Sequence, residues 1–419
     1  MNEGIPKDWS VYSFRDITER IQDGTHFSPK SQFGNYLYIT SKNIKRGKLD
    51  LSDVQYISRD DHDQIYRRCN VQRGDILLTK DGANTGNVAM NTLDEPFSLL
   101  SSVAFLRTKH SICSNHYLFQ YIASEHCQKQ IADLMTGNAI TRLTLEKMNG
   151  LSATLPPLPE QQKIAAILTS VDEVVEKTEA QISKLQDLKK GMMQELLSKG
   201  IGHTEFKDSP VGRIPSEWTF CPLSDVAFVK GGKRMPAGRP FAEGRTSYPY
   251  LRVSDFKDGT VVMDALRYVL PEDREKIKRY TISKDDLYIS IAGTLGLVGT
   301  VPTELDNAQL TENAAKIVFK RISDIDKRYF ACLLQSDLCQ RQFFRSKGTG
   351  GGVPKLALFR IENTLVPLPS KDEQRKIADL LESIDTRIRE ATLKQRVLQN
   401  LKKALMQDLL TGKVRVKVN

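Results

Sequence analysis

The chain has 419 residues, of which 40% are hydrophobic and 27% are charged, and its net charge is +10. This composition is ordinary for a globular protein of several domains, and no apolar run reaches the roughly 18 residues of a membrane-spanning helix. The six cysteines form no CxxC pair, which favours reduced thiols over a disulfide framework or a zinc site. Because the N-terminal segment does not resemble a signal peptide, we expect a cytoplasmic protein.

The first predicted domain spans residues 1–155 and has an α+β pattern. Ile76–Thr79 and Ser102–Leu106 are short runs rich in β-branched and apolar residues, which predicts buried strands. Helical structure is predicted around Asn115–Met135. The positive net charge suits a polyanionic partner but does not require one.

A long helix is predicted over residues 156–199, after the proline-rich segment Leu155–Pro159. Proline is tolerated before a helix and excluded from its interior. Apolar residues then recur in steps of four and three, the spacing of a coiled-coil seam. The predicted interface consists of Ile164, Leu168, Val171, Val175, Ile182 and Leu185, and the pattern then slips to Leu188, Met192 and Leu196. At 1.5 Å per residue the helix is about 60 Å long, so its apolar stripe needs a partner.

Residues 200–212 are rich in glycine and charge and are interpreted as a linker. A second α+β domain is predicted over 213–368, with strands at Leu287–Ile291 and Lys316–Phe319 and a helix at Lys327–Phe344. A second long helix follows at 369–412, and 413–419 is a tail. The interface predicted on this helix consists of Ile377, Leu381, Ile384, Ile388, Leu398 and Leu405, with Leu401 and Leu409 also on the apolar stripe.

The two halves are an internal repeat. Glu160–Lys199 aligns without a gap to Glu373–Gly412, and roughly two positions in five are identical, far above chance for a segment of this length. Trp9 and Trp218, the two tryptophans of the chain, occupy matching positions in the two domains. The repeat predicts a pseudo-symmetric molecule, and symmetric proteins often bind paired targets such as duplex DNA with two half-sites. The two helices are natural partners, parallel or antiparallel.

Paired tyrosines stand at similar depths in the two halves. Tyr36 and Tyr38, and likewise Tyr248 and Tyr250, alternate on predicted strands. We expect one tyrosine of each pair to belong to the core of its domain.

Motifs for catalysis are missing. The glycine-rich segment Gly348–Lys355 lacks the lysine and hydroxyl spacing of a nucleotide-binding P-loop, and no GxGxxG, HExxH or GxSxG motif occurs. We therefore interpret the chain as a reader or an assembler and not as an enzyme.

The ordered set of motifs resembles the specificity subunit of type I restriction-modification systems over essentially the whole chain. The resemblance lies in the proline-then-Glu-Gln entry to each long helix (Leu155–Gln161 and Leu368–Gln374) and in Asp23–Pro29, Gly231–Phe241 and Leu310–Ile317. It implies two target-recognition domains, each reading one half of a bipartite DNA site, held apart by two helices packed as an antiparallel coiled coil. It also implies no catalytic residue and no cofactor in this chain. The implied partners are two adenine methyltransferase subunits, which use S-adenosylmethionine, and restriction subunits, which use ATP and Mg.

Candidate DNA-contacting residues are polar and basic side chains in loops after predicted strands, because base edges are read by such groups while lysine and arginine hold phosphates. In the first domain they are Thr25, His26, Thr40, Ser41, Lys42, Asn43, Lys45, Arg46, Lys80, Asp81 and Asn84, with Asn43 suited to adenine. In the second domain they are Lys233, Arg234, Arg252, Ser254, Asp255, Lys257, Lys347, Thr349 and Lys355. As single residues, solvated loop polarity explains each of them about equally well.

The lysine pairs Lys189-Lys190 and Lys402-Lys403 recur on both long helices. They are interpreted as contacts to spacer phosphates or to a methyltransferase subunit, or as the solvated face of a coiled coil. One competing hypothesis for the whole chain is a coiled-coil scaffold that joins partner proteins without reading DNA. Another is a stand-alone nuclease or methyltransferase, against which the missing motifs argue.

Overall fold

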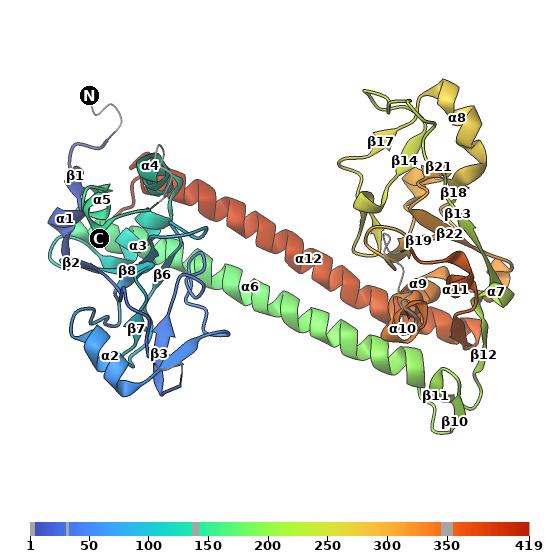
Figure 1. Cartoon of the computed structure of the whole chain (residues 1–419). Helices are drawn as coiled ribbons and strands as arrows, with labels where there is room; N and C mark the ends of the chain where they lie inside the picture. Colours follow the sequence, from blue (N-terminus) through green and yellow to red (C-terminus); the bar gives the residue numbers. More distant parts are fainter. Residues whose placement is uncertain (1–4, 31–32, 136–141, 345–354, 419) are drawn as a thin grey trace. The chain divides into compact units, whose positions relative to one another are not determined.

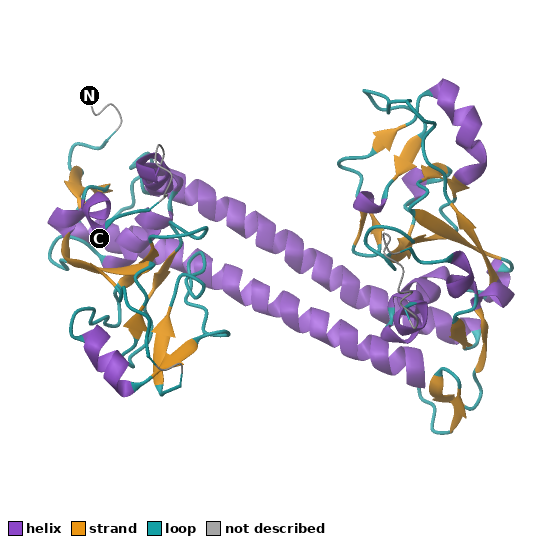
Figure 2. Ribbon diagram, viewed as in Figure 1, coloured by secondary structure: helices purple, strands orange, loops and turns teal. Residues whose placement is uncertain are grey.

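The computed structural model describes residues 5–30, 33–135, 142–344 and 355–418. The chain divides into two compact units, unit 1 of residues 1–180 with 392–419, and unit 2 of residues 181–391. Two long helices, α6 (Leu158–Lys199) and α12 (Lys371–Leu409), each contribute one part to either unit (Figure 1). Each unit is α+β and contains short strands, short helices, one part of α6 and one part of α12 (Figure 2).

The elements of unit 1 before α6 alternate between strands and helices. They are β1 (Ser10–Ser13), α1 (Phe14–Ile17), β2 (Thr18–Asp23), β3 (Tyr36–Ile39), β4 (Gln55–Ile57), α2 (Arg59–Tyr66), β5 (Ile76–Thr79), β6 (Val88–Met90), β7 (Ser98–Leu99), β8 (Val103–Thr108), α3 (Asn115–Ala123), α4 (Glu125–Met135), α5 (Leu145–Asn149) and β9 (Ser152–Leu155).

Unit 2 repeats this order with a few additional strands between α6 and α12. Its elements are β10 (Phe206–Ser209), β11 (Gly212–Pro215), β12 (Thr219–Pro222), α7 (Leu223–Val226), β13 (Ala227–Gly231), β14 (Pro249–Leu251), β15 (Phe256–Lys257), β16 (Thr260–Val261), β17 (Arg267–Tyr268), α8 (Pro271–Ile277), β18 (Thr281–Ile282), β19 (Leu287–Ser290), β20 (Val298–Thr300), β21 (Ala308–Leu310), β22 (Ala314–Phe319), α9 (Lys327–Gln335), α10 (Asp337–Phe343), α11 (Leu358–Glu362) and β23 (Leu365–Leu368).

The sheets of the two units have the same topology. Unit 1 has a four-stranded antiparallel sheet of order β2-β8-β5-β6, and unit 2 has the matching sheet β13-β22-β19-β20. A small sheet of shorter strands lies beside each one, three-stranded β4-β3-β7 in unit 1 and four-stranded β17-β14-β21-β18 in unit 2, where β18 is additional. The outer pair β1-β9 corresponds to β12-β23. The repeat seen in the sequence is therefore a repeat of whole domains.

The four-stranded sheet of unit 1 is buried on both faces. Ile76 and Leu78 of β5 belong to a core shared with the helices, whereas Leu77 and Phe105 belong to a second core under the small sheet. Side chains alternate between the two faces of a strand, so a run that is apolar at every position needs two cores. In the small sheets Tyr38 and Tyr250 are buried, which confirms that one tyrosine of each pair belongs to the core.

The helix predicted over residues 115–135 is interrupted. It splits at Ser124 into α3 and α4, and the helix predicted over 327–344 splits at Ser336 into α9 and α10. Each serine has an extended backbone, and its hydroxyl donates to the carbonyl oxygen three residues earlier, Tyr121 or Leu333, at 2.6 Å. Serine competes in this way with the helical hydrogen bonds, so each predicted helical stretch consists of two helices.

The long helices run antiparallel, as the resemblance implied. In unit 1, Lys402 pairs with Asp172 at 2.5 Å and Gln395 donates to Glu179 at 2.9 Å. From Asp172 to Glu179 the residue numbers rise along α6, while the bonded partners fall from Lys402 to Gln395 along α12, so the two helices run in opposite directions. In unit 2 the equivalent ion pair joins Lys189 of α6 to Asp385 of α12.

The predicted seam residues divide into two groups. At the start of each helix the residues are fully buried in the core of a globular part, Ile164 and Leu168 in unit 1, Ile377 and Leu381 in unit 2. Farther along, the remaining predicted interface residues are buried or half-buried: Val171, Val175, Ile182, Leu185, Ile384, Ile388, Leu398 and Leu405. Two further residues assigned to the apolar stripe, Leu188 and Leu401, are about half exposed, so the assignment was wrong for them, whereas Met192 and Leu196 of the slip pack against the core of unit 2.

The Glu-Gln pair at the start of each long helix anchors the helix to its globular part. Glu160 accepts a hydrogen bond from the indole of Trp9, and Glu373 accepts one from the indole of Trp218. The following glutamines bond identically: Gln161 accepts from the backbone N–H of Ser114 and donates to Pro156, and Gln374 accepts from that of Asp326 and donates to Pro369. These hydrogen bonds explain why glutamate and glutamine stand together at the start of each long helix.

The segments that follow the long helices complete these anchors. The β10-β11 hairpin begins in the predicted linker and extends beyond it to Pro215, and His203 of the linker lies 2.9 Å from Glu373. The C-terminal tail folds back in unit 1, where Arg415 pairs with Glu160 at 2.8 Å and with Asp8 at 2.6 Å. Linker and tail thus have equivalent roles in the two units.

Candidate nucleic-acid interface

The candidate loops begin where neighbouring parallel strands end. In unit 1, β3 and β7 are parallel with Ile39 opposite Leu99, and the backbone N–H of Leu100 donates to Ile39. In unit 2, β14 and β21 are parallel, and the N–H of Thr311 donates to Leu251. The carboxyl ends of parallel strands meet at one edge of a sheet. The loop after β3 therefore starts beside the loop after β7, and the same holds for β14 and β21.

Three further segments join each pair of loops through repeated backbone hydrogen bonds. In unit 1 the bonds run from Gly24 to Val103, Thr25 to Leu99, Lys80 to Ser102, and Leu143 to Lys80. In unit 2 they run from Gly232 to Ala314, Lys233 to Leu310, Ile291 to Asn313, and Leu356 to Ile291. We call these two sets of converging loops the loop clusters. Each cluster gathers five segments that are far apart in the sequence, and the frame is the same while the side chains differ.

Each frame requires glycine at one position. A Cβ atom on Gly24 would lie 2.0 Å from the carbonyl oxygen of Leu99, and one on Gly232 would lie 2.1 Å from that of Thr311. Real Cβ atoms do not approach backbone oxygen so closely, so the two strands could not come together with any other residue there.

The centre of the first loop cluster is a network of charges. Lys80, which is buried, lies 3.4 Å from the buried Asp23 and 3.3 Å from Asp81. Arg68 donates to Asp23 at 2.9 Å, and Arg142 donates through Nε to Asp81 at 2.9 Å. A buried lysine and carboxylate are held by mutual pairing, so Lys80 and Asp23 form the base of the network, whereas Arg68 and Arg142 project to its surface.

Several residues predicted in the first domain face inward. Asn43 is buried, accepts from the backbone N–H of Thr40 and donates to the carbonyls of Asp50 and Asp53. Its amide closes the loop, so this geometry opposes the prediction that Asn43 reads adenine. Thr25 is buried, and its hydroxyl accepts from the N–H of Phe27.

The outward set of the first domain is strongly basic. His26, Lys42, Lys45, Arg46 and Asn84 are exposed. Thr40, Ser41 and Asp81 are partly buried between them. Three cations within one loop form the kind of surface that holds phosphates.

In the second loop cluster, Lys233 and Arg234 follow the Gly232 crossing and are exposed. The carbonyl of Lys233 accepts from the hydroxyl of Tyr250, which fixes the loop over the small sheet. Arg234 donates through Nε to Glu312 at 2.5 Å, and Glu312 accepts from the hydroxyl of Thr311 at 3.0 Å. This bond to the Glu312 carboxylate raises the pKa of Arg234 above its ordinary value.

The loop after β14 is built differently. Asp255 is buried and accepts from the backbone and guanidinium of Arg252, so both residues stabilise the loop itself. Ser254 and Lys257 are exposed beside them, and Lys355 is exposed where its segment bridges to Ala292. Lys347 and Thr349 lie outside the described residues.

Sequence reasoning missed Arg68, Arg142, Glu312 and Asn313. Arg68 and Arg142 lie outside the segments that follow an obvious strand, and they reach the cluster through long-range bonds to Asp23 and Asp81. The internal repeat contains one signal for Arg142. It is the equivalent of the candidate Lys355, and the two residues bridge to equivalent positions, Asp81 and Ala292.

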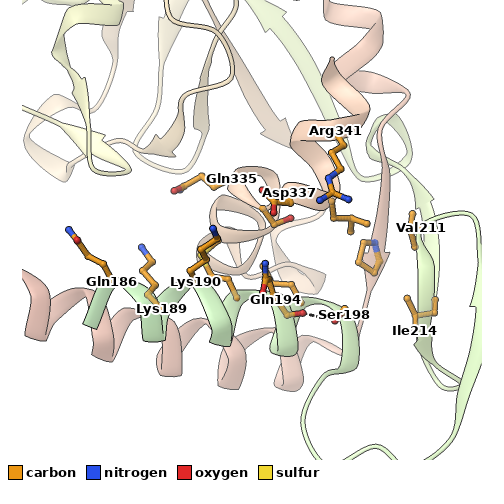
Figure 3. A pocket seen from close by; sticks show the side chains of 15 residues that line it. Gln186, Lys189, Lys190, Gln194, Ser198, Val211, Ile214, Gln335, Asp337 and Arg341 are labelled. Atoms are coloured by element: carbon orange, nitrogen blue, oxygen red, sulfur yellow. Dashed lines mark hydrogen bonds between the residues drawn. The ribbon is translucent and has the colours of Figure 1, made fainter. Parts of the chain in front are cut away.

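The repeated lysine pairs are divided between two roles. Lys189 and Lys402 pair with aspartates of the opposite long helix, and Lys403 pairs with Glu125 at 2.7 Å. Lys190 lines a cavity of about 530 Å³ in unit 2, between the end of α6, the β10-β11 hairpin and α10 (Figure 3). Met193 and Leu197 give this cavity an apolar side, and Lys190 and Arg341 give it a basic one.

Within the described part of the chain, no group of three or more histidine, cysteine, aspartate or glutamate side chains is placed to bind a metal ion. None of the helices in that same part is long and apolar enough to span a bilayer.

Comparison with known proteins agrees with the repeat. The family model described as "Type I restriction modification DNA specificity domain" matches residues 6–187 and again 215–399. The type I restriction enzyme MjaVIII specificity subunit of Methanocaldococcus jannaschii is 27% identical, over 99% of this chain and 94% of that protein. The EcoKI specificity subunit of Escherichia coli K12 is 21% identical, over 91% of this chain and 82% of that protein.

Among solved structures, the S subunit of a type I restriction-modification system from M. genitalium superposes with a TM-score of 0.59. The match covers 98% of this chain and 97% of that one at 17% sequence identity, a level at which the likeness shows the fold alone. The family model, in contrast, matches both halves and most of the sequence. The chain therefore belongs to the type I restriction-modification DNA specificity family.

Proposed function

We propose that the chain is the DNA specificity subunit of a type I restriction-modification complex, in which each unit reads one half of a bipartite site through its loop cluster. The observation that carries this proposal is the pair of loop clusters, which share one backbone frame but present different side chains. A shared frame places both clusters against DNA in the same way, and different side chains select different bases.

The phosphate contacts are assigned to the exposed cations around each cluster. In unit 1 these are Lys42, Lys45 and Arg46, and in unit 2 they are Lys233, Lys257 and Lys355. Asn43, Lys80 and Asp255 are left out of the proposed DNA-contacting set, because their polar atoms are used inside the protein.

The long helices set the unread spacer between the half-sites and dock the partner subunits. Two adenine methyltransferase subunits and the restriction subunits are the proposed partners, and they hold S-adenosylmethionine, ATP and Mg. This chain carries out no chemistry in the proposal. Its work on chromosomal and incoming DNA would take place in the cytoplasm. The cavity beside Lys190 offers a mixed apolar and basic surface for a methyltransferase segment.

The test is duplex binding by the complex of this chain with its methyltransferase partner, measured over a range of salt concentrations. Removing one phosphate-binding cation should lower the slope of log affinity against log salt by about one. The variant K45A/R46A should therefore bind more weakly to all sequences and show a shallower slope. The variant K163A, at an exposed lysine near the start of α6, is the matched control. A scaffold that does not touch DNA through these loops would leave the affinity and the salt slope of the complex unchanged in the loop variant.

A further inference from the structure

Two exposed arginines, one in each loop cluster, are held by the same device. Arg142 donates from Nε to Asp81 at 2.9 Å, and Arg234 donates from Nε to Glu312 at 2.5 Å. Their side chains are 50% and 78% exposed. A guanidinium that is bound through Nε keeps the two terminal nitrogens, Nη1 and Nη2, side by side at its outer end.

The anchoring carboxylates are themselves fixed. The other oxygen of Asp81 lies 3.3 Å from Nζ of the buried Lys80, and the other oxygen of Glu312 accepts from the Thr311 hydroxyl at 3.0 Å. An arginine attached to a fixed carboxylate loses less conformational freedom on binding than a free one. Such pre-positioning is expected of a group that selects its ligand and is unnecessary for a phosphate contact.

Two other arginines, Arg20 on β2 and Arg252 after β14, instead use outer nitrogens for hydrogen bonds within the protein. Arg20 uses Nη1 for Asn70 and Nη2 for the carbonyl of Arg68. Arg252 uses Nε and Nη2 for Asp255 and again Nη2 for the carbonyl of Ala265. By contrast, no bond to Nη1 or Nη2 of Arg142 or Arg234 is found within the described residues.

From this geometry we infer that Arg142 and Arg234 are specificity-determining residues that each read one guanine, Arg142 in the half-site of unit 1 and Arg234 in that of unit 2. The paired Nη1 and Nη2 donors match the O6 and N7 acceptors that guanine presents in the major groove, and no other base presents two acceptors there. The inference rests on the proposed function and adds to it one G·C pair in each half-site.

The two arginines enter from different loops. Arg142 occupies the position of Lys355 in the repeat, where its segment bridges to Asp81 as Lys355 bridges to Ala292. Arg234 instead follows the Gly232 crossing, where unit 1 has His26 after the Gly24 crossing. The guanines should therefore stand at different positions within the two half-sites.

The experiment maps adenine methylation in a methylation-free host that expresses this chain with its methyltransferase partner. The wild type should give a bipartite motif with a fixed G·C pair in each half. R142A should make one such pair degenerate, with discrimination at that pair falling roughly 10- to 100-fold, and should leave the other half unchanged. R234A should do the reverse, so each variant is the other's internal control.

Two further variants separate reading from folding. R321A changes an exposed arginine beyond Phe319, at the end of β22 away from the loop cluster, and should leave the motif unchanged. E312A should relax the same pair as R234A but less completely, and E312Q, which keeps an oxygen acceptor for Nε, should relax it least. Thermal unfolding of each purified variant checks that the fold is intact.

The inference is overturned if the motif of R142A or R234A stays fixed at every position. It is also overturned if methylation falls evenly at all sites without relaxing a G·C pair, since that pattern marks a phosphate contact. If the wild type itself yields no bipartite motif, the proposed function fails, and the inference fails with it.

Discussion

Lys189 of α6 and Asp385 of α12 form a 2.6 Å ion pair in unit 2. The repeat places Lys402 and Asp172 in the equivalent positions, and they form a 2.5 Å ion pair in unit 1. The two long helices therefore use one residue pair twice, as the internal repeat predicts. Both pairs are partly exposed, so they fix the register of the helices more than they stabilise them.

Reversing the charge of Lys189 tests whether its pairing with Asp385 contributes to the stability of unit 2. K189D places two acids together and should lower the free energy of unfolding of unit 2 by about 1 kcal/mol, and K189D/D385K should restore most of that loss. Chemical unfolding followed by the fluorescence of Trp218, in a W9F background, measures it. K184D, on an exposed position of α6, is the control. A double variant no more stable than the sum of the single ones would disprove the pairing.

The hydrogen bonds to Glu373 should contribute more to the stability of unit 2 than the Lys189–Asp385 ion pair does. Glu373 accepts bonds from the Trp218 indole, the His203 ring and the backbone N–H of Ile201. E373A removes all three acceptor contacts and should destabilise unit 2 by about 2–3 kcal/mol, whereas E373Q, which keeps one oxygen, should cost less. Urea unfolding curves check both variants. Equal stability of E373A and the wild type would show that the helix is attached by its apolar residues alone.

The glycine crossings are predicted to be intolerant of any side chain. G232A forces a Cβ to within 2.1 Å of the Thr311 carbonyl oxygen, so β13 and the loop after β21 must separate. We expect sequence selectivity to be lost in the half-site of unit 2 and kept in the other, as measured by the methylation motif. G244A has no neighbouring atom within 4 Å and serves as the control. An unaltered motif in G232A would mean that the crossing does not shape the reading surface.

Unit 1 should weaken in mild acid. Burial lowers the pKa of His62 below 6.5, and its ring stacks on Tyr36 at 4.1 Å and bonds the Ser98 hydroxyl. The folded state therefore keeps His62 neutral while the unfolded chain takes up a proton. The stability contribution is complete above pH 6.5 and is lost as pH falls toward the lowered pKa.

Urea unfolding of unit 1, measured about one pH unit above and below 6.5, tests this dependence. H62Q should reduce the difference between the two midpoints but not abolish it, because burial also lowers the pKa of His116. A pH dependence that is identical in H62Q and wild type would contradict the assignment.

The sequence predicted those features that depend on periodicity and repetition. The paired domains and the long helices follow from repeated residues and from the apolar spacing that any packed helix must obey. It did not locate the breaks within the helical stretches, where the Ser124 and Ser336 hydroxyls compete with the backbone hydrogen bonds.

The candidate site was less predictable, because loop polarity does not reveal which way a side chain points. Asn43 and Lys80 are residue types that often contact DNA. In unit 1, however, Asn43 donates to the carbonyl of Asp50 and Lys80 pairs with Asp23. Arg142 stands far from Asp81 in the sequence, and only the folded chain brings the two together. Long-range pairings of this kind leave no periodic trace in a single sequence.

The most direct test of the central claim is an adenine-methylation map of the source genome with this gene intact and with it deleted. If the chain reads a bipartite site, deletion removes one motif of two half-sites around a fixed spacer and leaves all other methylation in place. If the two maps are identical while the partner methyltransferase is expressed, the chain does not direct methylation, and the scaffold hypothesis replaces the one proposed.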